Sequence, residues 1–487
     1  MDFSDLSHHS RSRRSASFTP FLLPDALLPL ALGVLACVLL HGSAQAASAE
    51  QKGGPDAPFP VIRTLTLDDL IRMSREASPQ LWAEYYALEQ GQAQLDQARS
   101  GRLPRLEAFE IASLVPAAKG NAVFSPDERS NLLDDLGPFT RIEVHVNQPL
   151  YTFGRLKAHV EAAQKGLEAK EASMKKFELE LVKSVRELYY TAQLNNEVDR
   201  VVSDTVEQFE KAVEKAEEFL ETGEGTVTQQ DLLKLRYGSS RAKEELLRIK
   251  KGKLLTHSAI RRLISLPKGE EFELAEKNLK PVSFTLQELE FYQGYVKERP
   301  EWRQLEAGID AKRAELRAEQ RAYLPDIFVT GLFRYAVAPD RDRQENPFVV
   351  EEFNYLDGGV LLGWRLALDF GLPHRIAEKR AEVLRLEQQK REASSGLVLE
   401  IEQAYREVEE QHQRLAFAAE SRKSGRGLAA TSAASFHLGL SDAKDVFEAF
   451  GIYTEAAAHY YVTIKDFNIA VAELQRVTVQ EPPAGEK

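Results

Sequence analysis

The sequence has almost no cysteine: Cys37 is its one thiol. A disulfide framework within the chain, a cysteine zinc site and a redox pair are therefore excluded. An excess of positive charge is also missing, since 63 Lys and Arg stand against 75 Asp and Glu, a formal net charge of −12. This acidic balance argues against a nucleic-acid-binding protein, because phosphate binding needs a basic surface.

The first 46 residues are typical of an export signal. Three arginines between positions 11 and 14 precede an uncharged apolar run at 26–40. Ala44 and Ala46 then supply small residues at the −3 and −1 positions of a cleavage site. We expect a signal peptide at 1–46 with cleavage after Ala46. The alternatives are an N-terminal anchor helix and lipidation at Cys37, and the second is disfavoured because the apolar run continues past that residue.

Long apolar runs are absent from the rest of the chain, where no uncharged run reaches eighteen residues. A membrane helix needs about 20 such residues, so none is expected after the signal. If the mature chain enters a membrane, it must do so as strands in a closed barrel, since only helices and closed barrels satisfy their backbone groups in lipid.

The mature chain reads as two copies of one unit. Leu103-Pro104 aligns with Leu324-Pro325, and the spacing Gly225–Asp231 recurs as Gly439–Asp445. Landmarks in the same order in both halves indicate an internal structural repeat. We expect an N-terminal periplasmic segment at 47–65, a first repeat at 66–282, a second repeat at 283–478 and a C-terminal tail at 479–487.

Each repeat is expected to begin with a helix, the first of which runs roughly from Leu67 to Arg102, and to continue with a strand pair. The pairs fall at about 103–151 and about 324–370. Apolar residues alternate with polar ones from 141 to 147, and apolar residues occupy every second position from Val360 to Leu368. A period of two residues is typical of a half-buried strand. The side chains expected to face lipid are Ile142, Val144, Val146, Val360, Leu362 and Trp364.

A long helical hairpin is expected after each strand pair, at 154–266 and at 373–477. No Gly or Pro interrupts 167–222, and apolar residues recur there in steps of three and four. A single helix over 154–222 would be ~100 Å long at 1.5 Å per residue. No globular core needs that length, so the chain builds something elongated.

Four strands per chain cannot close a barrel, and open edges are not tolerated in lipid. Three copies supply twelve strands, an even number suited to an outer-membrane barrel. The predicted fold is therefore an α+β membrane protein in which a homotrimer forms a 12-stranded barrel continued by a coiled-coil α-helical tunnel.

Several segments carry a resemblance to a known family: LPRLEAF, YLPDIFV, NQPLYTFGRLKAHVEAAQ, LALDFGLPHR, TGEGTVTQQDLL and FHLGLSDAKDVFEA. Over about residues 60–478 the chain resembles the outer membrane efflux protein family, the TolC-like channels. The resemblance implies an export duct of a tripartite efflux pump or type I secretion system. It places the chain in the outer membrane of a Gram-negative bacterium with a large periplasmic part. The implied partners are an inner-membrane transporter, a periplasmic adaptor (membrane fusion protein) and outer-membrane lipid.

The resemblance also assigns roles to residues at the two hairpin turns. The periplasmic tip and adaptor-docking residues are Thr222, Gly223, Gly225, Leu438, Gly439, Leu440, Ser441 and Asp442. The acidic aperture maps onto Asp445 and Glu448, and Asp231 is assigned to the same aperture. Asp231 matches the aspartate that an arginine ties down in the family, but Ser441 stands where that arginine would be.

Catalytic residues, cofactor-binding residues and metal ligands are not predicted. None of the histidines after the signal forms a His-x-x-x-His pair, and Gly439-Leu-Ser-Asp-Ala lacks the final glycine of a nucleophile elbow. An enzyme is thus disfavoured. The runner-up is a periplasmic adaptor or coiled-coil scaffold protein. An adaptor should carry one hairpin rather than two hairpins that each follow a strand pair, and a cytoplasmic scaffold should lack the signal and the alternating strands. The exported substrate is not encoded in any recognisable pocket.

Overall fold

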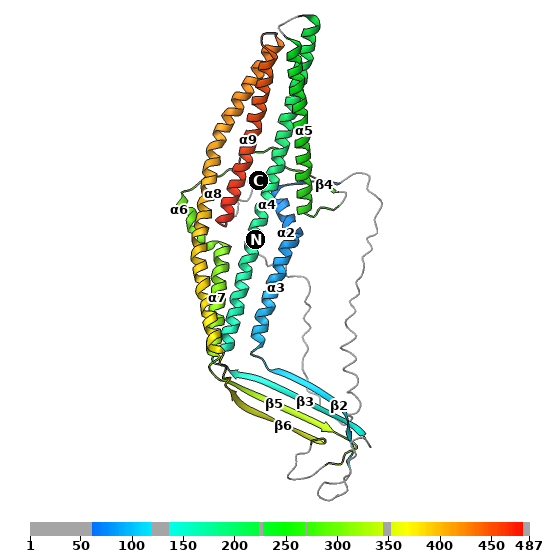
Figure 1. Cartoon of the computed structure of the whole chain (residues 1–487), viewed down its shortest axis with the longest axis vertical. Helices are drawn as coiled ribbons and strands as arrows, with labels where there is room; N and C mark the ends of the chain where they lie inside the picture. Colours follow the sequence, from blue (N-terminus) through cyan, green and yellow to red (C-terminus); the bar gives the residue numbers. More distant parts are fainter. Residues whose placement is uncertain (1–60, 119–135, 224–226, 268–269, 344–351, 481–487) are drawn as a thin grey trace. The chain divides into compact units, whose positions relative to one another are not determined.

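The computed structural model describes residues 61–118, 136–223, 227–267, 270–343 and 352–480 (Figure 1). The expected signal at 1–46 and the last seven residues of the tail lie outside this part of the chain. The elements of the first half are β1 (Val61–Leu65), α2 (Leu67–Ala77), α3 (Pro79–Ser100), β2 (Arg105–Pro116), β3 (Leu136–Tyr151), α4 (Arg155–Thr222) and α5 (Gln229–Leu263). Those of the second half are β4 (Glu270–Leu274), α6 (Leu289–Gln293), the 3-10 helix η2 (Gly294–Glu298), α7 (Pro300–Arg321), β5 (Asp326–Val337), β6 (Tyr355–Arg365), α8 (Leu372–His437) and α9 (Ala443–Val477).

The helix expected from Leu67 to Arg102 is two helices, because the chain breaks at Ser78. Its backbone is extended, with φ −73° and ψ 111°, and its hydroxyl accepts a hydrogen bond from the Leu81 N–H. Pro79 explains the break, since proline disfavours a helical conformation in the residue before it and has no N–H to donate. The expectation of one continuous helix was therefore wrong, and Ser78 caps the start of α3 instead.

Two very long helices organise the rest. Helix α4 has 68 residues and α8 has 66, which is about 100 Å each at 1.5 Å per residue. Near the sheet the packing order of the helices is α3, α4, α7 and α8, and near the hairpin turns it is α5, α4, α9 and α8 (Figure 1). Gly154 and Gly223 flank α4 with φ of +82° and +72°, a left-handed conformation that glycine adopts without steric cost.

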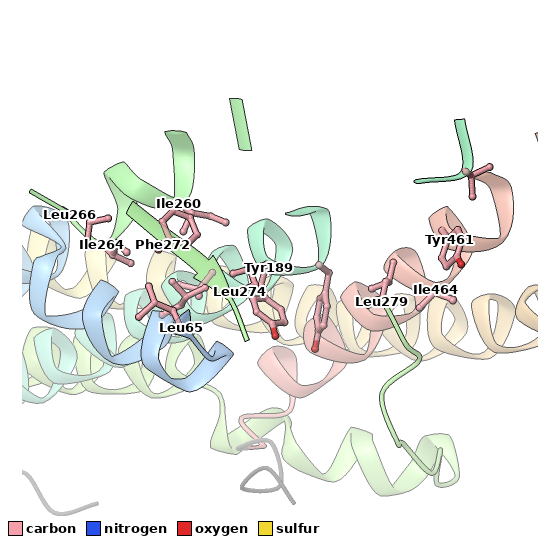
Figure 2. Packing of buried hydrophobic residues seen from close by; sticks show 14 of the residues in the cluster. Leu65, Tyr189, Ile260, Ile264, Leu266, Phe272, Leu274, Leu279, Tyr461 and Ile464 are labelled. Carbon is pink, nitrogen blue, oxygen red and sulfur yellow. The ribbon is translucent and has the colours of Figure 1, made fainter. Parts of the chain in front are cut away.

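The largest apolar cluster lies where several short elements meet α4 partway along its length. Leu65 of β1, Leu70 of α2, Tyr189 of α4, Ile260 of α5 and Ile464 of α9 all belong to it, and Figure 2 shows most of these side chains together. Burying a large apolar side chain contributes about 1.5–3 kcal/mol. This cluster therefore holds β1, α2, α5 and α9 against the middle of α4.

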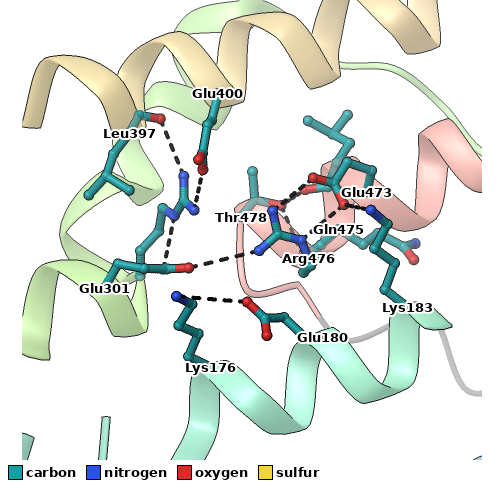
Figure 3. A network of polar contacts seen from close by, with 12 residues as sticks. Lys176, Glu180, Lys183, Glu301, Leu397, Glu400, Glu473, Gln475, Arg476 and Thr478 are labelled. Atoms are coloured by element: carbon teal, nitrogen blue, oxygen red, sulfur yellow. Dashed lines mark hydrogen bonds and ion pairs between the residues drawn. The ribbon is translucent and has the colours of Figure 1, made fainter. Parts of the chain in front are cut away.

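A network of charged side chains also joins α4, α7, α8 and α9 partway along α4 (Figure 3). The Arg299 side chain is only 1% exposed and pairs with Glu400 at 2.6 Å and Glu301 at 3.3 Å. Glu473 pairs with Arg476 at 2.8 Å and Lys183 at 3.1 Å. Burial alone would raise the pKa of Glu473, but these two cations hold it below its ordinary value. Buried charges are stable only when paired in this way.

The four-stranded sheet is antiparallel throughout, in the order β2-β3-β5-β6. It joins the long helices directly, since only three residues separate β3 from α4 and six separate β6 from α8. Strand β6 ends at Arg365, so the expected extension of this strand pair to about 370 was too long. Within the described ranges, no helix combines the length and the apolar character needed to cross a membrane.

Candidate functional site

Strands β3, β5 and β6 of the four-stranded sheet share one apolar face, and β2 adds Leu106 and Ala108 but also Glu110 to it. Directly paired residues of antiparallel strands point to the same side of a sheet. Ile142, Val144 and Val146 of β3 pair with Tyr335, Phe333 and Gly331 of β5, and residues 327, 329 and 331 of β5 pair with Trp364, Leu362 and Val360 of β6. The register therefore places all six residues of the expected lipid-facing row on one face. Leu366 and Leu368 lie beyond the end of β6 and do not extend it.

This apolar face is strongly exposed on the single chain. Val360 is 78% exposed, Leu362 72% and Trp364 71%. Contiguous apolar patches of this kind are rare on soluble monomers and mark contact with a membrane or another protein.

The opposite face of the sheet is polar and holds its charges in pairs. Glu143, which lies between Val144 and Ile142 along β3, is 3.3 Å from His145 Nε2. The arginine–carboxylate pairs on this face are Arg105–Glu107 at 2.8 Å, Arg141–Glu143 at 3.3 Å and Arg334–Asp357 at 2.9 Å. Such a face suits contact with water.

The turn between α8 and α9 presents two leucines to solvent. The N–H of Gly439 donates to Phe436 O and that of Leu440 donates to Ser435 O, each at 2.9 Å. With Gly439 at φ +70°, this is a Schellman motif, which satisfies the last carbonyls of α8. Leu438 and Leu440 are both more than 70% exposed on either side of the glycine.

Ser441 and Asp442 complete this turn, and of these two residues Asp442 is exposed. The hydroxyl of Ser441 is buried and has no hydrogen-bond partner among the described residues. Asp442 occupies the N-cap position of α9 without a side-chain capping bond.

The two hairpin turns lie beside each other. The rings of Phe219, near the end of α4, and Phe436, near the end of α8, are 6.2 Å apart. The first turn contains Thr222, the last residue of α4, and Gly223, whereas Gly225 lies outside the described residues. The structure thus brings together the ends of α4 and α8, which belong to separate halves of the sequence.

The three predicted aperture carboxylates differ in their surroundings. Asp445 and Glu448 are exposed on α9, while Val446 and Ala449 between and beside them are buried. Glu448 lies 3.6 Å from Lys444, one turn earlier on the same helix. Their exposure is what an aperture requires, but the cation beside Glu448 was not anticipated from the sequence.

Asp231 is instead engaged at the start of α5. Its carboxylate accepts hydrogen bonds from the Thr228 N–H at 3.1 Å and the Thr228 hydroxyl at 2.6 Å, and Lys234 lies 3.2 Å away. The hydrogen bond from Thr228, and after it the nearby Lys234, hold the pKa of Asp231 below its ordinary value. This capping box was not predicted from the sequence, although Thr228-x-x-Asp231 has the residue pattern of one.

Thr228→Ala is expected to loosen the first turn of α5, because it removes the hydroxyl that caps the Asp231 N–H. Losing an N-cap costs about 1 kcal/mol, which corresponds to roughly fivefold faster amide exchange through local opening in that turn. Hydrogen exchange followed by mass spectrometry measures this, with Thr228→Ser as a control that keeps the hydroxyl. Equal exchange in Thr228→Ala and the wild type would show that the box does not form in the assembled protein.

The same turn should respond to acid. Because the folded pKa of Asp231 lies below the unfolded value, its carboxylate contributes stability above about pH 4, and this is lost as pH falls through the folded pKa. Exchange in the wild-type turn should therefore approach that of Thr228→Ala at low pH.

In the described ranges, no group of three or more His, Cys, Asp and Glu side chains is placed to hold a metal ion. Among the described residues, the candidate functional features are two sheet faces and one pair of helical turns.

The comparisons with known proteins agree with these features. Residues 70–264 match the family model described as outer membrane efflux protein. No curated protein matches the chain. The resemblance to this family that the sequence segments suggested is confirmed.

Solved structures show that the fold is that of outer membrane efflux channels, with a sheet and a helical tunnel. The Campylobacter jejuni CmeC outer membrane channel is 15% identical with a TM-score of 0.69, covering 85% of each chain. The outer membrane protein VceC from Vibrio cholerae is 16% identical with a TM-score of 0.69, covering 85% of this chain and 95% of its own. The open state of the Neisseria gonorrhoeae MtrE outer membrane channel is 15% identical with a TM-score of 0.63, covering 88% and 94%.

Proposed function

We propose that this chain is an outer-membrane export duct that carries substrates from an inner-membrane transporter across the periplasm and the outer membrane. The observation that carries the proposal is a four-stranded sheet with an exposed apolar face, joined by short connections to helices of 68 and 66 residues. The exposed apolar face of the sheet suits contact with lipid. The two long helices suit a tunnel that spans the periplasm.

The duct is a homotrimer. Strands β2 and β6 are the two edges of the described sheet, and each has one side without a strand partner. An unpaired edge in hydrocarbon leaves backbone N–H and C=O groups unsatisfied, at several kcal/mol each. Pairing β6 of one copy with β2 of the next removes every edge and closes a barrel of twelve strands.

The chain is built from two repeats, at 66–282 and 283–478. In both halves a 22-residue helix, two strands, a very long helix and a 35-residue helix follow one another. Two similar halves in three chains give the tunnel pseudo-sixfold packing, which suits a tube better than a globular core.

The two faces of the sheet take opposite environments in this barrel. The row from Ile142 to Val146 and the row from Val360 to Trp364 face lipid. The polar face lines the lumen, where water solvates its ion pairs. Burying that face in lipid would cost about 2–4 kcal/mol for each Arg near the midplane.

The paired hairpin turns form the periplasmic end of the duct. The exposed Leu438 and Leu440 flank Gly439 and meet a periplasmic adaptor, together with Thr222, Gly223 and Gly225 of the first half and Ser441 and Asp442 of the second. Asp445 and Glu448 narrow the aperture. Asp231 lies near it as the cap of α5, so any latch between the turns uses groups other than an Asp231–arginine pair.

The orientation of the chain across the outer membrane tests the proposal, because an adaptor or scaffold does not cross that membrane. Asp340→Cys, at the loop end of β5, should be labelled in intact cells by a maleimide on a polymer too large to pass the duct. Leu440→Cys should be labelled only after the outer membrane is permeabilised. Labelling of Leu440→Cys but not Asp340→Cys in intact cells would reverse the orientation. Equal shielding of both, in a protein that fractionates with the periplasm, would favour the adaptor or scaffold.

A further inference from the structure

Helix α5 carries a row of side chains that the described part of the chain leaves exposed. The row advances in steps of four and three, so its members lie along one flank of the helix. Its apolar members are more than half exposed, with Leu254 at 70%. The row consists of Leu233, Tyr237, Ser240, Glu244, Leu247, Lys251 and Leu254.

Helix α8 carries a matching row at the other end of the helix order α5, α4, α9 and α8. Its members are also exposed, but most of them are small. A Cβ added at Gly427 would meet no atom within 4 Å, so the space beside this row is open. The row consists of Gln413, Ala416, Glu420, Ser424, Gly427, Thr431 and Ala434.

The positions of the two rows along the helix axes, called their heights below, can be compared through contacts with the intervening helices α4 and α9. Each of these helices runs antiparallel to its neighbours in the order α5, α4, α9 and α8. Three contacts fix these heights: Lys253 Nζ lies 3.3 Å from Asp199, Thr205 Oγ1 lies 2.8 Å from Thr454 Oγ1, and a Cβ on Gly425 would lie 3.3 Å from Tyr453 Cα.

Counting along the helices from these contacts aligns the rows. Residue 199 is six residues before Thr205 on α4, so it lies level with residue 460, which is six residues after Thr454 on the antiparallel α9. Residue 460 is seven residues after Tyr453, so it lies level with residue 418, which is seven residues before Gly425 on α8. Lys253 is thus level with residue 418, and Lys251, two residues nearer the turn, is level with Glu420. By the same count Tyr237 is level with Ala434, and Leu254 is level with residue 417, next to Ala416.

We propose that the α5 row of one copy packs against the α8 row of a second copy, with Lys251 opposite Glu420 across the seam. The proposal rests on the trimeric duct and specifies how its tunnel closes. A rotation axis parallel to the helices leaves heights unchanged, so side chains at one height meet their counterparts in the next copy. Large side chains on α5 then fill the spaces between small ones on α8, as knobs fill holes in coiled coils.

Charge supports the same register. Within the part of the chain that the structure describes, neither Lys251 nor Glu420 has an ion-pair partner, whereas Lys253 on α5 pairs with Asp199 and Arg414 on α8 pairs with Glu410. A second copy supplies the missing partner for both at once.

A charge exchange tests the pairing. Lys251→Glu and Glu420→Lys should each shorten the half-time of trimer dissociation in warm detergent by roughly threefold or more, because like charges then face each other at three seams. The double variant should recover the wild-type half-time. Lys250→Glu, one residue off the row, is the matched control that Glu420→Lys should not rescue. Absence of rescue in the double variant would overturn the pairing.

Disulfide trapping tests the seam without changing charge. Leu254→Cys with Ala416→Cys should form oxidised species of two and three chains, because α5 and α8 lie at opposite edges of one chain. Leu233→Cys with Ala416→Cys is the control, since residues 233 and 254 are about 30 Å apart along α5. A trimer that forms without trapping overturns the seam and leaves the duct intact. A chain that forms no trimer overturns both.

Discussion

Leu362→Lys is expected to lower assembly into the outer membrane sharply, whereas Leu361→Lys is expected to be tolerated. These neighbours on β6 are both exposed leucines, at 72% and 61%, but Leu362 pairs with Val329 on the apolar face and Leu361 with Thr330 on the polar face. A lysine facing lipid near the midplane costs about 2–4 kcal/mol per chain, and a trimer contains it three times.

The measurement is the amount of heat-resistant oligomer in outer-membrane fractions of the two variants. Because the residues are adjacent and alike, the comparison cancels effects of strand propensity and synthesis. Equal loss in both variants, or loss confined to Leu361→Lys, would contradict the assignment of the faces.

The second large effect concerns ion selectivity at the hairpin turns, which we propose form the periplasmic end of the duct. Removing both exposed carboxylates with Asp445→Ala and Glu448→Ala should reduce cation preference and abolish block by divalent or trivalent cations. In a trimer these residues give six carboxylates around one axis, whose mutual field concentrates cations over about 10 Å at 0.1 M salt. The Lys444–Glu448 pair is exposed on both sides and so offsets little of this charge.

Single-channel recordings in planar bilayers measure both properties. Asp445→Asn with Glu448→Gln should reproduce the effect, since it removes charge and keeps shape, and Lys444→Ala should increase cation preference. Unchanged selectivity and unchanged block in the double alanine variant would place both side chains outside the lumen and leave the duct itself standing.

The sheet could be predicted from the sequence to a large extent, because its signal is local. Alternation with period two assigned Ile142, Val144 and Val146 to one face, and the register with β5 and β6 places the second-half row on that same face. Strand ends were less certain: β6 stops at Arg365, where alternation alone continued to Leu368. The break at Ser78 depended on one proline whose effect the helical periodicity concealed.

The positions of the two hairpin turns could be predicted from the sequence, but the contacts and exposure of their side chains could not. Glycine spacing placed the turns, whereas the rotation of α9 that leaves Asp445 and Glu448 exposed is set by packing of Val446 and Ala449 against other helices. The buried hydroxyl of Ser441 and the engagement of Asp231 by Thr228 likewise depend on how the turn folds. Local charge patterns do not encode such contacts.

The conductance of the purified wild-type protein tests the export duct most directly. The three-chain species, isolated from the outer membrane and added to a planar bilayer, should produce discrete current steps of uniform size, and heating to single chains should abolish them. A three-chain species that inserts into the bilayer without carrying current, or a protein recovered only as single chains in the periplasm, would contradict the duct.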